Sequence, residues 1–143
     1  DVNFREDIFA DRGEAKSVYA PWLERADILK LSEEEAELFF GGDKKARLTK
    51  LSESRKIFVT LGKRGAELYE DGSYTECGTV DVRVIDTNGA GDAFYAGALR
   101  QIDAGEQDGR KILRYANVCG ALATTKHGAT EALPCESEVK KYL

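Results

Sequence analysis

Residues 86–94 read DTNGAGDAF, so three small residues stand between two aspartates just before a helical pattern begins. A helix N-terminus exposes unpaired backbone N–H groups and carries a partial positive charge, which attracts a phosphate or a developing oxyanion. The small residues Gly89, Ala90 and Gly91 let an anion approach the main chain closely. This stretch therefore predicts an anion-binding turn.

Asp92 is the unexpected member of the turn, because its carboxylate would repel the anion that the N–H groups bind. A carboxylate beside a substrate hydroxyl can accept its proton while the N–H groups stabilise charge on a transferred phosphoryl group. Together these groups have the parts of a phosphotransferase site. The alternative is that Asp86 and Asp92 only cap the turn and the helix, since short glycine motifs are weakly specific.

The elements that would position this turn alternate between strands and helices. Apolar and small residues recur at helical spacing in 90–104 and in 109–126, where small residues favour close packing on a sheet. The apolar run within 56–62 predicts a strand that is covered on both faces. Residues 66–82 alternate around Asp71-Gly72-Ser73 as a β-hairpin would.

The earlier part of the chain repeats this alternation. Residues 16–26 have a helical pattern, and 27–32 form a short strand-like run. Ser32 and the acidic residues after it predict the start of a helix that stops at Gly41-Gly42. A charged helix is expected over about 43–52. Strands that alternate with helices indicate a layered α/β domain.

The composition bounds the class of protein. With 143 residues, 42% apolar and 33% charged, the chain has the composition of one soluble globular domain without a membrane span or a secretory segment, so we expect a cytoplasmic location. A net charge of −5 without a basic block argues against nucleic acid as a partner. Three cysteines without metal-ligand spacing predict reduced, structural thiols. Because the chain has no methionine and opens like the end of a strand, we interpret it as a fragment.

Several segments resemble the ribokinase-like, or phosphofructokinase-B type, carbohydrate kinases. DTNGAGDAFYAGAL is similar to the family's C-terminal signature, D-T-x-G-A-G-D. Four more segments look like family segments, in the family's order and at about its spacing: DVNFR, ADILKLSEEEAELFFG, FVTLGKRGAELY and LRYANVCGALATTKHGATEALP. The resemblance therefore covers practically the whole chain. The second and the last of these look most like fructokinases, whereas DVNFR also resembles the 2-keto-3-deoxygluconate kinases.

The resemblance implies a three-layer α/β/α sandwich with a mainly parallel sheet, of which residues 1–143 form a single α/β domain, the C-terminal nucleotide-binding half. A full-length member has an additional N-terminal half that supplies most sugar contacts and a lid. The implied activity of the parent protein is ATP-dependent phosphorylation of a sugar hydroxyl, with fructose as the first substrate. A 2-keto-3-deoxygluconate kinase and a ribokinase-type sugar kinase are alternatives, and a non-catalytic fructokinase-like interaction module is the alternative from another class.

The resemblance also assigns the chemistry. Asp92 would be the catalytic base and would contact the sugar hydroxyl, and the N–H groups of Gly89, Ala90 and Gly91 would form the anion hole. Arg5 would contact a phosphate or an acidic sugar group, against the alternative of a weak surface ion pair.

In the family, the loop that contains Thr60, Gly62 and Gly65 lies along the nucleotide phosphates. Without the family, a glycine-bearing hairpin turn would explain these residues. Asn117 and Gly128 would border the adenine pocket. Their alternatives are a buried asparagine satisfied by the backbone and a glycine that caps a helix C-terminus.

Glu35 matches the glutamate of the family's N-x-x-E motif, which acts on magnesium through water, although Ser32 replaces the motif's asparagine. A solvated acidic helix face is the alternative for Glu35. Asp86 matches a region where many members bind a monovalent cation, which leaves potassium open as a cofactor. The expected ligands are therefore ATP with magnesium and a small sugar, without nucleic acid or membrane partners, and a homodimer stays open.

Overall fold

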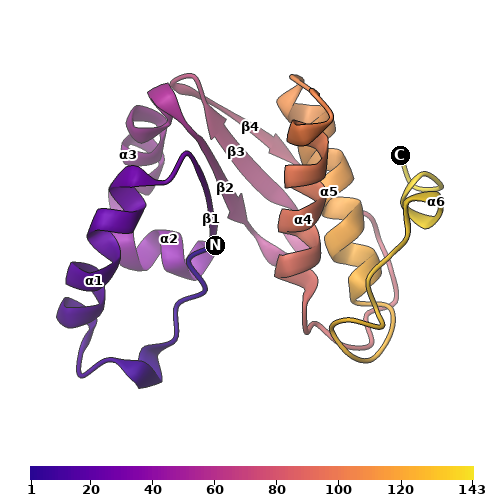
Figure 1. Cartoon of the computed structure of the whole chain (residues 1–143), viewed down its shortest axis with the longest axis horizontal. Helices are drawn as coiled ribbons and strands as arrows, with labels where there is room; N and C mark the ends of the chain where they lie inside the picture. The colour runs from indigo at the N-terminus through magenta and orange to yellow at the C-terminus, as the bar shows by residue number, and fades with distance from the viewer. The chain divides into compact units, whose positions relative to one another are not determined.

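The computed structural model describes all 143 residues of the chain (Figure 1). The helices are α1 (Arg12–Arg25), α2 (Glu33–Phe40), α3 (Lys44–Leu51), α4 (Ala90–Asp103), α5 (Gly109–Ala123) and α6 (Glu136–Val139). The strands are β1 (Ile28–Ser32), β2 (Lys56–Thr60), β3 (Ala66–Glu70) and β4 (Ser73–Cys77). Short 3-10 helices are η1 (Glu6–Ile8), η2 (Gly41–Asp43), η3 (Ser52–Ser54) and η4 (Gly62–Arg64). None of the helices combines the length and the apolar character that crossing a bilayer requires.

The chain divides into two compact units. The first unit contains residues 1–60 and 68–74, and the second unit contains residues 61–67 and 75–143. Helices and strands occur together as the sequence predicts, so the α/β class is confirmed.

The four strands form one sheet in the order β1-β2-β3-β4. β1 and β2 are parallel, with Ile28 opposite Lys56 and Ser32 opposite Thr60. Only residues 61–65 join β2 to β3, and a parallel pair needs a crossover of about a dozen residues, so β2 and β3 must be antiparallel. The sheet is therefore mixed, and the prediction of a mainly parallel sheet is wrong for these strands.

The hairpin of β3 and β4 turns where the sequence predicts. Asp71 and Gly72 have φ angles of 50° and 68°, and a two-residue hairpin loop of this kind needs positive φ at both positions. The predicted hairpin of 66–82 is too long, because β4 ends at Cys77. At that point, the Asn117 side chain donates to the carbonyl oxygens of Cys77 and Gly78. In a longer strand, these oxygens would instead accept N–H groups of a neighbouring strand.

The core of the first unit lies on its two parallel strands. Ile57, Phe58 and Val59 are fully buried in succession, which confirms a strand that is covered on both faces. Ser32 ends β1 and caps α2, and Gly41 ends α2 with a φ of 72°, as the sequence predicts for both ends. In Figure 1, α1, α2 and α3 lie beside β1 and β2.

The second unit is built on the close packing of α4 against α5. A Cβ atom at Gly97 would lie 2.8 Å from the Cys119 sulfur, and one at Gly120 would lie 3.1 Å from the Ala90 carbonyl oxygen. The small residues therefore let one helix approach another here. The predicted helix of 109–126 ends earlier, at Ala123, because the hydroxyls of the next two threonines donate back to carbonyl oxygens of the last turn.

Candidate functional site

The start of α4 has no side-chain cap. The side chains of Asp11, Ser32 and Asp108 cap α1, α2 and α5. The corresponding position of α4 is Gly89, which has a left-handed backbone with φ of 75° and no side chain to offer. The first N–H groups of α4 are therefore not taken by a cap.

The first turn of α4 combines open N–H donors with a carboxylate. The Ala93 N–H makes the first helical bond, at 2.9 Å to the carbonyl of the N-cap residue. The Ala90 N–H makes a long bond of 3.3 Å to the Thr87 carbonyl, so this donor is partly used. The N–H groups of Gly91 and Asp92 have no partner, and the Asp92 side chain is exposed. The Asp92 carboxylate makes no capping bond. The alternative that Asp92 only caps the helix is therefore wrong.

Asp86 ties the turn before α4 to the loop after α5. Its two carboxylate oxygens accept the N–H groups of Asn88 at 3.0 Å and Gly128 at 3.1 Å. These two bonds, the one from Asn88 first, hold the pKa of Asp86 below its usual range. The Ile85 and Asp86 N–H groups both donate to the Thr124 carbonyl, at 2.7 and 3.2 Å. Asp86 therefore has the turn-capping role that the sequence left open, and cation binding stays a prediction.

The glycines on both sides of this junction fit closely. Gly128 has a φ of 86° and lies beyond the end of α5, so its interpretation as a helix C-cap is wrong. A Cβ atom at Gly89 would lie 3.0 Å from the Ala129 Cβ atom. A side chain at Gly89 would therefore push the loop after α5 away from the anion turn.

The loop of residues 61–65 is the turn that joins β2 to β3. The Leu61 N–H donates to the Gly65 carbonyl at 2.8 Å and closes it. Gly62 is exposed with a φ of 59°, whereas Gly65 is buried with a φ of 101°. A Cβ atom at Gly65 would lie 2.1 Å from the Cys77 carbonyl oxygen. The hairpin interpretation is confirmed, and the phosphate role of this loop stays a prediction.

Asn117 is buried on α5 and holds the end of β4. Its Nδ2 group donates to the Cys77 carbonyl at 2.8 Å and to the Gly78 carbonyl at 3.4 Å. The Asn117 carbonyl accepts the Thr79 hydroxyl at 3.2 Å. This is the buried asparagine satisfied by backbone that the sequence offered as the alternative. Contact with adenine stays a prediction.

Three predicted site residues belong to the first unit. Thr60 is the last residue of β2, and its hydroxyl makes a long bond of 3.4 Å to the Leu31 carbonyl. Glu35 lies in the first turn of α2, where both of its carboxylate oxygens accept backbone N–H groups. Arg5 is exposed and has neither an ion pair nor a hydrogen bond from its side chain, so the surface ion pair weighed from the sequence is absent.

No group of three or more His, Cys, Asp or Glu side chains comes together as a metal cage. Magnesium usually keeps several waters and takes one or two protein carboxylates together with nucleotide oxygens. A single carboxylate such as Glu35 fits that donor set, because each of its oxygens accepts one N–H bond and keeps a lone pair for a magnesium-bound water.

Lys30 was not predicted from the sequence; it lies in the middle of β1 and is only 8% exposed. A single lysine inside the apolar run ILKLS was the available signal, because lysine is rarely buried without a partner. Its partner is Asp1, with both carboxylate oxygens 3.1 Å from the ammonium nitrogen.

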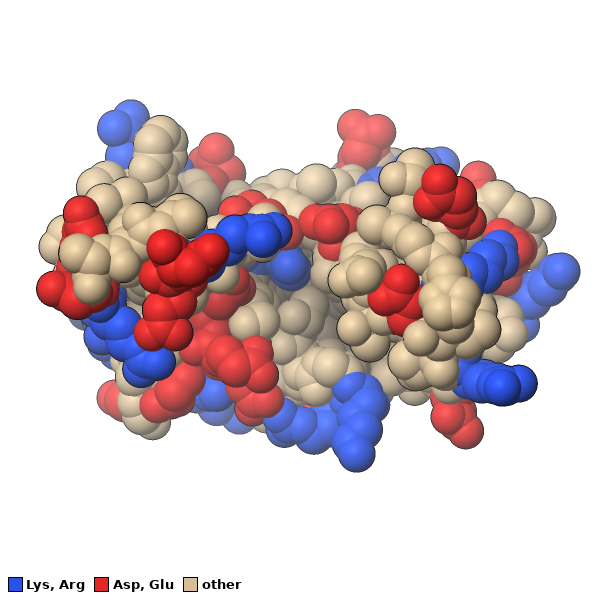
Figure 2. Space-filling view, turned by 90° about the horizontal axis from the view of Figure 1, so that it is seen from below, with Lys and Arg blue, Asp and Glu red and all other residues tan.

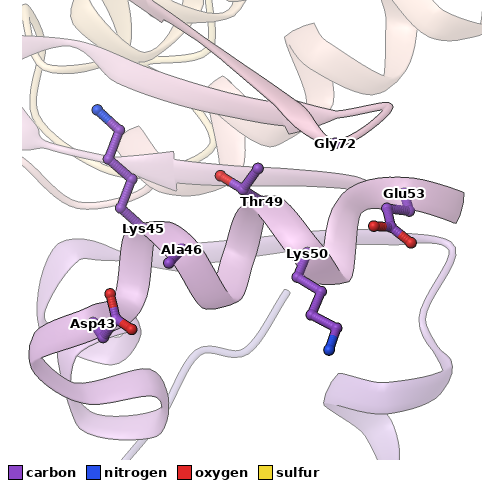
Figure 3. A pocket seen from close by; sticks show the side chains of 7 residues that line it. All are labelled: Asp43, Lys45, Ala46, Thr49, Lys50, Glu53 and Gly72. Carbon is purple, nitrogen blue, oxygen red and sulfur yellow. The ribbon is translucent and has the colours of Figure 1, made fainter.

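Each of the two units contains a cavity that lies apart from the predicted site residues. In the first unit, a cavity of about 590 Å³ lies between α3 and the β3–β4 turn (Figure 3). In the second unit, a cavity of about 460 Å³ is lined by residues of α4 and α5 and by the last residue of the chain. None of the predicted site residues lines either cavity. On the face shown in Figure 2, basic side chains are interspersed with acidic ones.

Comparison with known proteins gives a match over nearly all of the chain. Residues 1–135 match the family model described as pfkB family carbohydrate kinase. A fructokinase from Escherichia coli is 36% identical over 149 residues, which cover 98% of this chain and 48% of that protein. The chain thus spans about half the length of most curated relatives it matches.

Solved structures show the same fold. The crystal structure of a fructokinase double mutant from Vibrio cholerae O395, in its fructose-, ADP- and potassium-bound form, has a TM-score of 0.87 and 31% identity. The match covers 99% of this chain and 48% of that chain. A ribokinase II from Escherichia coli, solved with ATP and Mg²⁺, has a TM-score of 0.85 and 28% identity over 98% of this chain and 45% of its own. The chain therefore has the ribokinase-like α/β fold.

Proposed function

Because the chain belongs to the pfkB family of carbohydrate kinases, we propose that the protein transfers the terminal phosphoryl group of ATP to a sugar hydroxyl. The observation that carries this proposal is the uncapped start of α4, where open N–H donors and the exposed Asp92 carboxylate share one helical turn. Fructose is the first substrate that we propose, because the relatives with the higher identities are fructokinases and one was solved with fructose. A 2-keto-3-deoxygluconate kinase and a ribokinase-type kinase are the alternatives.

Asp92 would accept the proton of the sugar hydroxyl as that oxygen attacks the phosphoryl group. The N–H groups of Gly89 and Gly91, together with that of Asp92 and with a smaller contribution from Ala90, would hold the oxygens of the group in transfer. Catalysis of this kind depends mostly on positioning and on electrostatic stabilisation.

The charge of Asp92 favours the transition state over the bound substrate. While Asp92 is ionised, it repels the phosphate that the neighbouring N–H groups attract. Once Asp92 accepts the proton, this repulsion ends and the same N–H groups hold the phosphoryl group more strongly. An interaction that strengthens during the reaction accelerates the chemical step.

The nucleotide would extend from the first turn of α4 past glycines and other small residues, whose backbone it can approach closely. We assign the phosphates to the loop of Thr60, Gly62 and Gly65, and the adenine to the surroundings of Asn117 and Gly128. Gly65 and Asn117 both belong to the second unit and both lie against the backbone at the end of β4, so this strand end would fix the distance between Gly65 and the adenine site.

Metal ions would act on the phosphates. Magnesium would neutralise charge on them, with Glu35 as a ligand of its waters, and Asp86 would contribute to a monovalent-cation site, with potassium as the first candidate. Equal turnover in potassium-free and potassium-containing buffer would reject the cation site. A cytoplasmic location and a homodimer stay predictions, which localisation and sedimentation measurements test.

The test is a coupled assay of ADP formation by the intact protein with fructose, ribose and 2-keto-3-deoxygluconate. We expect ADP formation that depends on added sugar, with the highest kcat/KM for fructose. ATP binding without sugar-dependent turnover would instead favour the non-catalytic interaction module.

A further inference from the structure

The cavity of the second unit lies where α4 ends and α5 begins, two helices that pack side by side (Figure 1). Gln101 lines it from the last turn of α4, and Asp92 lies nine residues earlier in the same helix. At about 1.5 Å per residue, about 14 Å of helix separates the two residues. The cavity volume of about 460 Å³ is in the range of about 300–1,000 Å³ that holds small organic ligands. The proposed phosphoryl transfer leaves this cavity without a role.

Three cationic side chains of α5 line the cavity: Arg110, Lys111 and Arg114. Arg110 and Arg114 are four residues apart, so they lie on the same side of the helix. The Arg110 side chain has neither an ion pair nor a hydrogen bond, although its backbone N–H is bonded. The Arg114 side chain makes one bond, from Nη2 to the Tyr142 carbonyl at 2.6 Å. Because a guanidinium carries five N–H donors, both arginines have donors free for a ligand.

The acidic side chains of the cavity already have partners. Asp108 caps α5, and its Oδ1 atom accepts the N–H groups of Arg110 and Lys111 at 2.9 and 3.3 Å. Glu106 accepts two N–H groups of the loop before α5, and its Oε2 atom lies 3.7 Å from the Lys111 ammonium nitrogen. Lys111 and Glu106 therefore balance each other, and the two arginines face a single further carboxylate. The side chains that line the cavity have a net positive charge.

The remaining wall of the cavity is neutral and partly apolar. It includes Tyr115 and Leu143 in addition to Gln101. A guanidinium binds a carboxylate or a phosphate through two parallel hydrogen bonds. Apolar groups beside such donors favour an anion that has an organic part over a bare inorganic ion.

We propose that this cavity is a second ligand site, which binds a small organic anion with a carboxylate or a phosphate monoester. Arg110 and Arg114 hold the oxyanion, and Tyr115 contacts the organic part. The cavity contains none of the residues assigned to sugar, nucleotide or metal. The inference therefore does not depend on the proposed function of the protein.

Cys77 gives the test a local reporter, because this partly exposed free thiol also lines the cavity. Iodoacetamide labelling of Cys77 in the intact protein is followed by peptide mass spectrometry, with citrate or glycerol 3-phosphate as the added anion and glycerol as the neutral control. An anion at about ten times its Kd leaves about one tenth of the sites open, so labelling of Cys77 should be about tenfold slower. The exposed Cys135, which does not line the cavity, should react at an unchanged rate.

Arg110→Gln removes the guanidinium that has no protein partner, so the fold should be unaffected. We expect the anion concentration that halves the labelling rate to rise about tenfold or more, the usual effect of losing a hydrogen bond to a charged group. Arg83→Gln is the matched control, because Arg83 is an exposed arginine of the same unit that does not line the cavity. It should leave this concentration unchanged.

Protection of Cys77 by only one of the two anions supports the proposal and identifies the oxyanion as a carboxylate or a phosphate; protection by both also supports it. No protection at about 10 mM of either anion would overturn the proposal, since a Kd of about 1 mM would already give about tenfold protection. Protection that is equally strong in Arg110→Gln would overturn it as well. If Cys77 reacts too slowly, isothermal titration calorimetry of the same variants measures the same Kd values, and the same outcomes decide.

Discussion

Gly65→Ala is the substitution whose cost the structure defines most completely. Gly65 has φ and ψ angles of 101° and −132°, a region that is essentially restricted to glycine. Its added Cβ atom would also lie 2.1 Å from the Cys77 carbonyl oxygen and 2.7 Å from the Gly78 Cα atom. The backbone of Cys77 cannot yield freely, because Asn117 holds the same carbonyl at 2.8 Å.

The two effects add to a large loss of stability. A strained backbone of this kind costs about 1–3 kcal/mol. Overpacking costs about 1–3 kcal/mol more. The sum is roughly 4 kcal/mol, a large share of the roughly 5–15 kcal/mol that a domain has in total. At about 2–4 °C per kcal/mol, the Tm should fall by roughly 8–16 °C.

Two neighbouring glycines separate the contributions. Gly62 has a φ of 59° but open space around its Cβ position, so Gly62→Ala should cost only the backbone strain, about 1–2 kcal/mol. Gly78 has neither a positive φ nor a contact within 4 Å, so Gly78→Ala should be close to neutral. Urea unfolding and thermal melts followed by circular dichroism measure all three. A Gly65→Ala protein that is as stable as Gly62→Ala would refute the clash with Cys77.

The other predictions concern titration and thiol reactivity. The bonds from Asn88 and Gly128 lower the pKa of Asp86, so its stabilising effect is present above the unfolded value of about 4 and is lost as the pH falls through the folded value. Tm values of Asp86→Asn and the unmodified protein should converge as the pH falls from about 7 to about 3, and a constant difference would contradict this. Burial raises the pKa of Cys119 to about 11, so iodoacetamide at about pH 8 should label the exposed Cys135 quickly and Cys119 only after unfolding. Peptide mass spectrometry that finds Cys119 labelled in the folded protein would show that it is accessible.

Features that depend on neighbouring residues could be predicted from the sequence. The Ser32 cap, the helix end at Gly41 and the turn at Asp71-Gly72 each follow from a few adjacent residues and their preferred backbone angles. The glycine turn before Asp92 belongs to this class as well, since its signal lies within one short stretch.

Features that depend on distant contacts were missed. The early end of β4 at Cys77 follows from Asn117, which is 40 residues away in the chain. The bond from the Phe4 N–H to Glu35 spans 31 residues, and neither residue indicates it alone. The antiparallel return of β3 was missed for a different reason, because apolar runs mark strands but do not give their direction.

The central claim is that Asp92 takes the proton of the acceptor hydroxyl beside the open N–H groups of α4, and Asp92→Asn in the intact protein tests it most directly. Sugar-dependent turnover should fall by about 10²- to 10⁴-fold, the usual contribution of a general base. ATP affinity should stay the same or increase, because a negative charge beside the phosphates is removed. Asp103→Asn, at the exposed far end of the same helix, is the matched control and should leave both quantities unchanged. Turnover of Asp92→Asn near that of the unmodified protein would contradict the account.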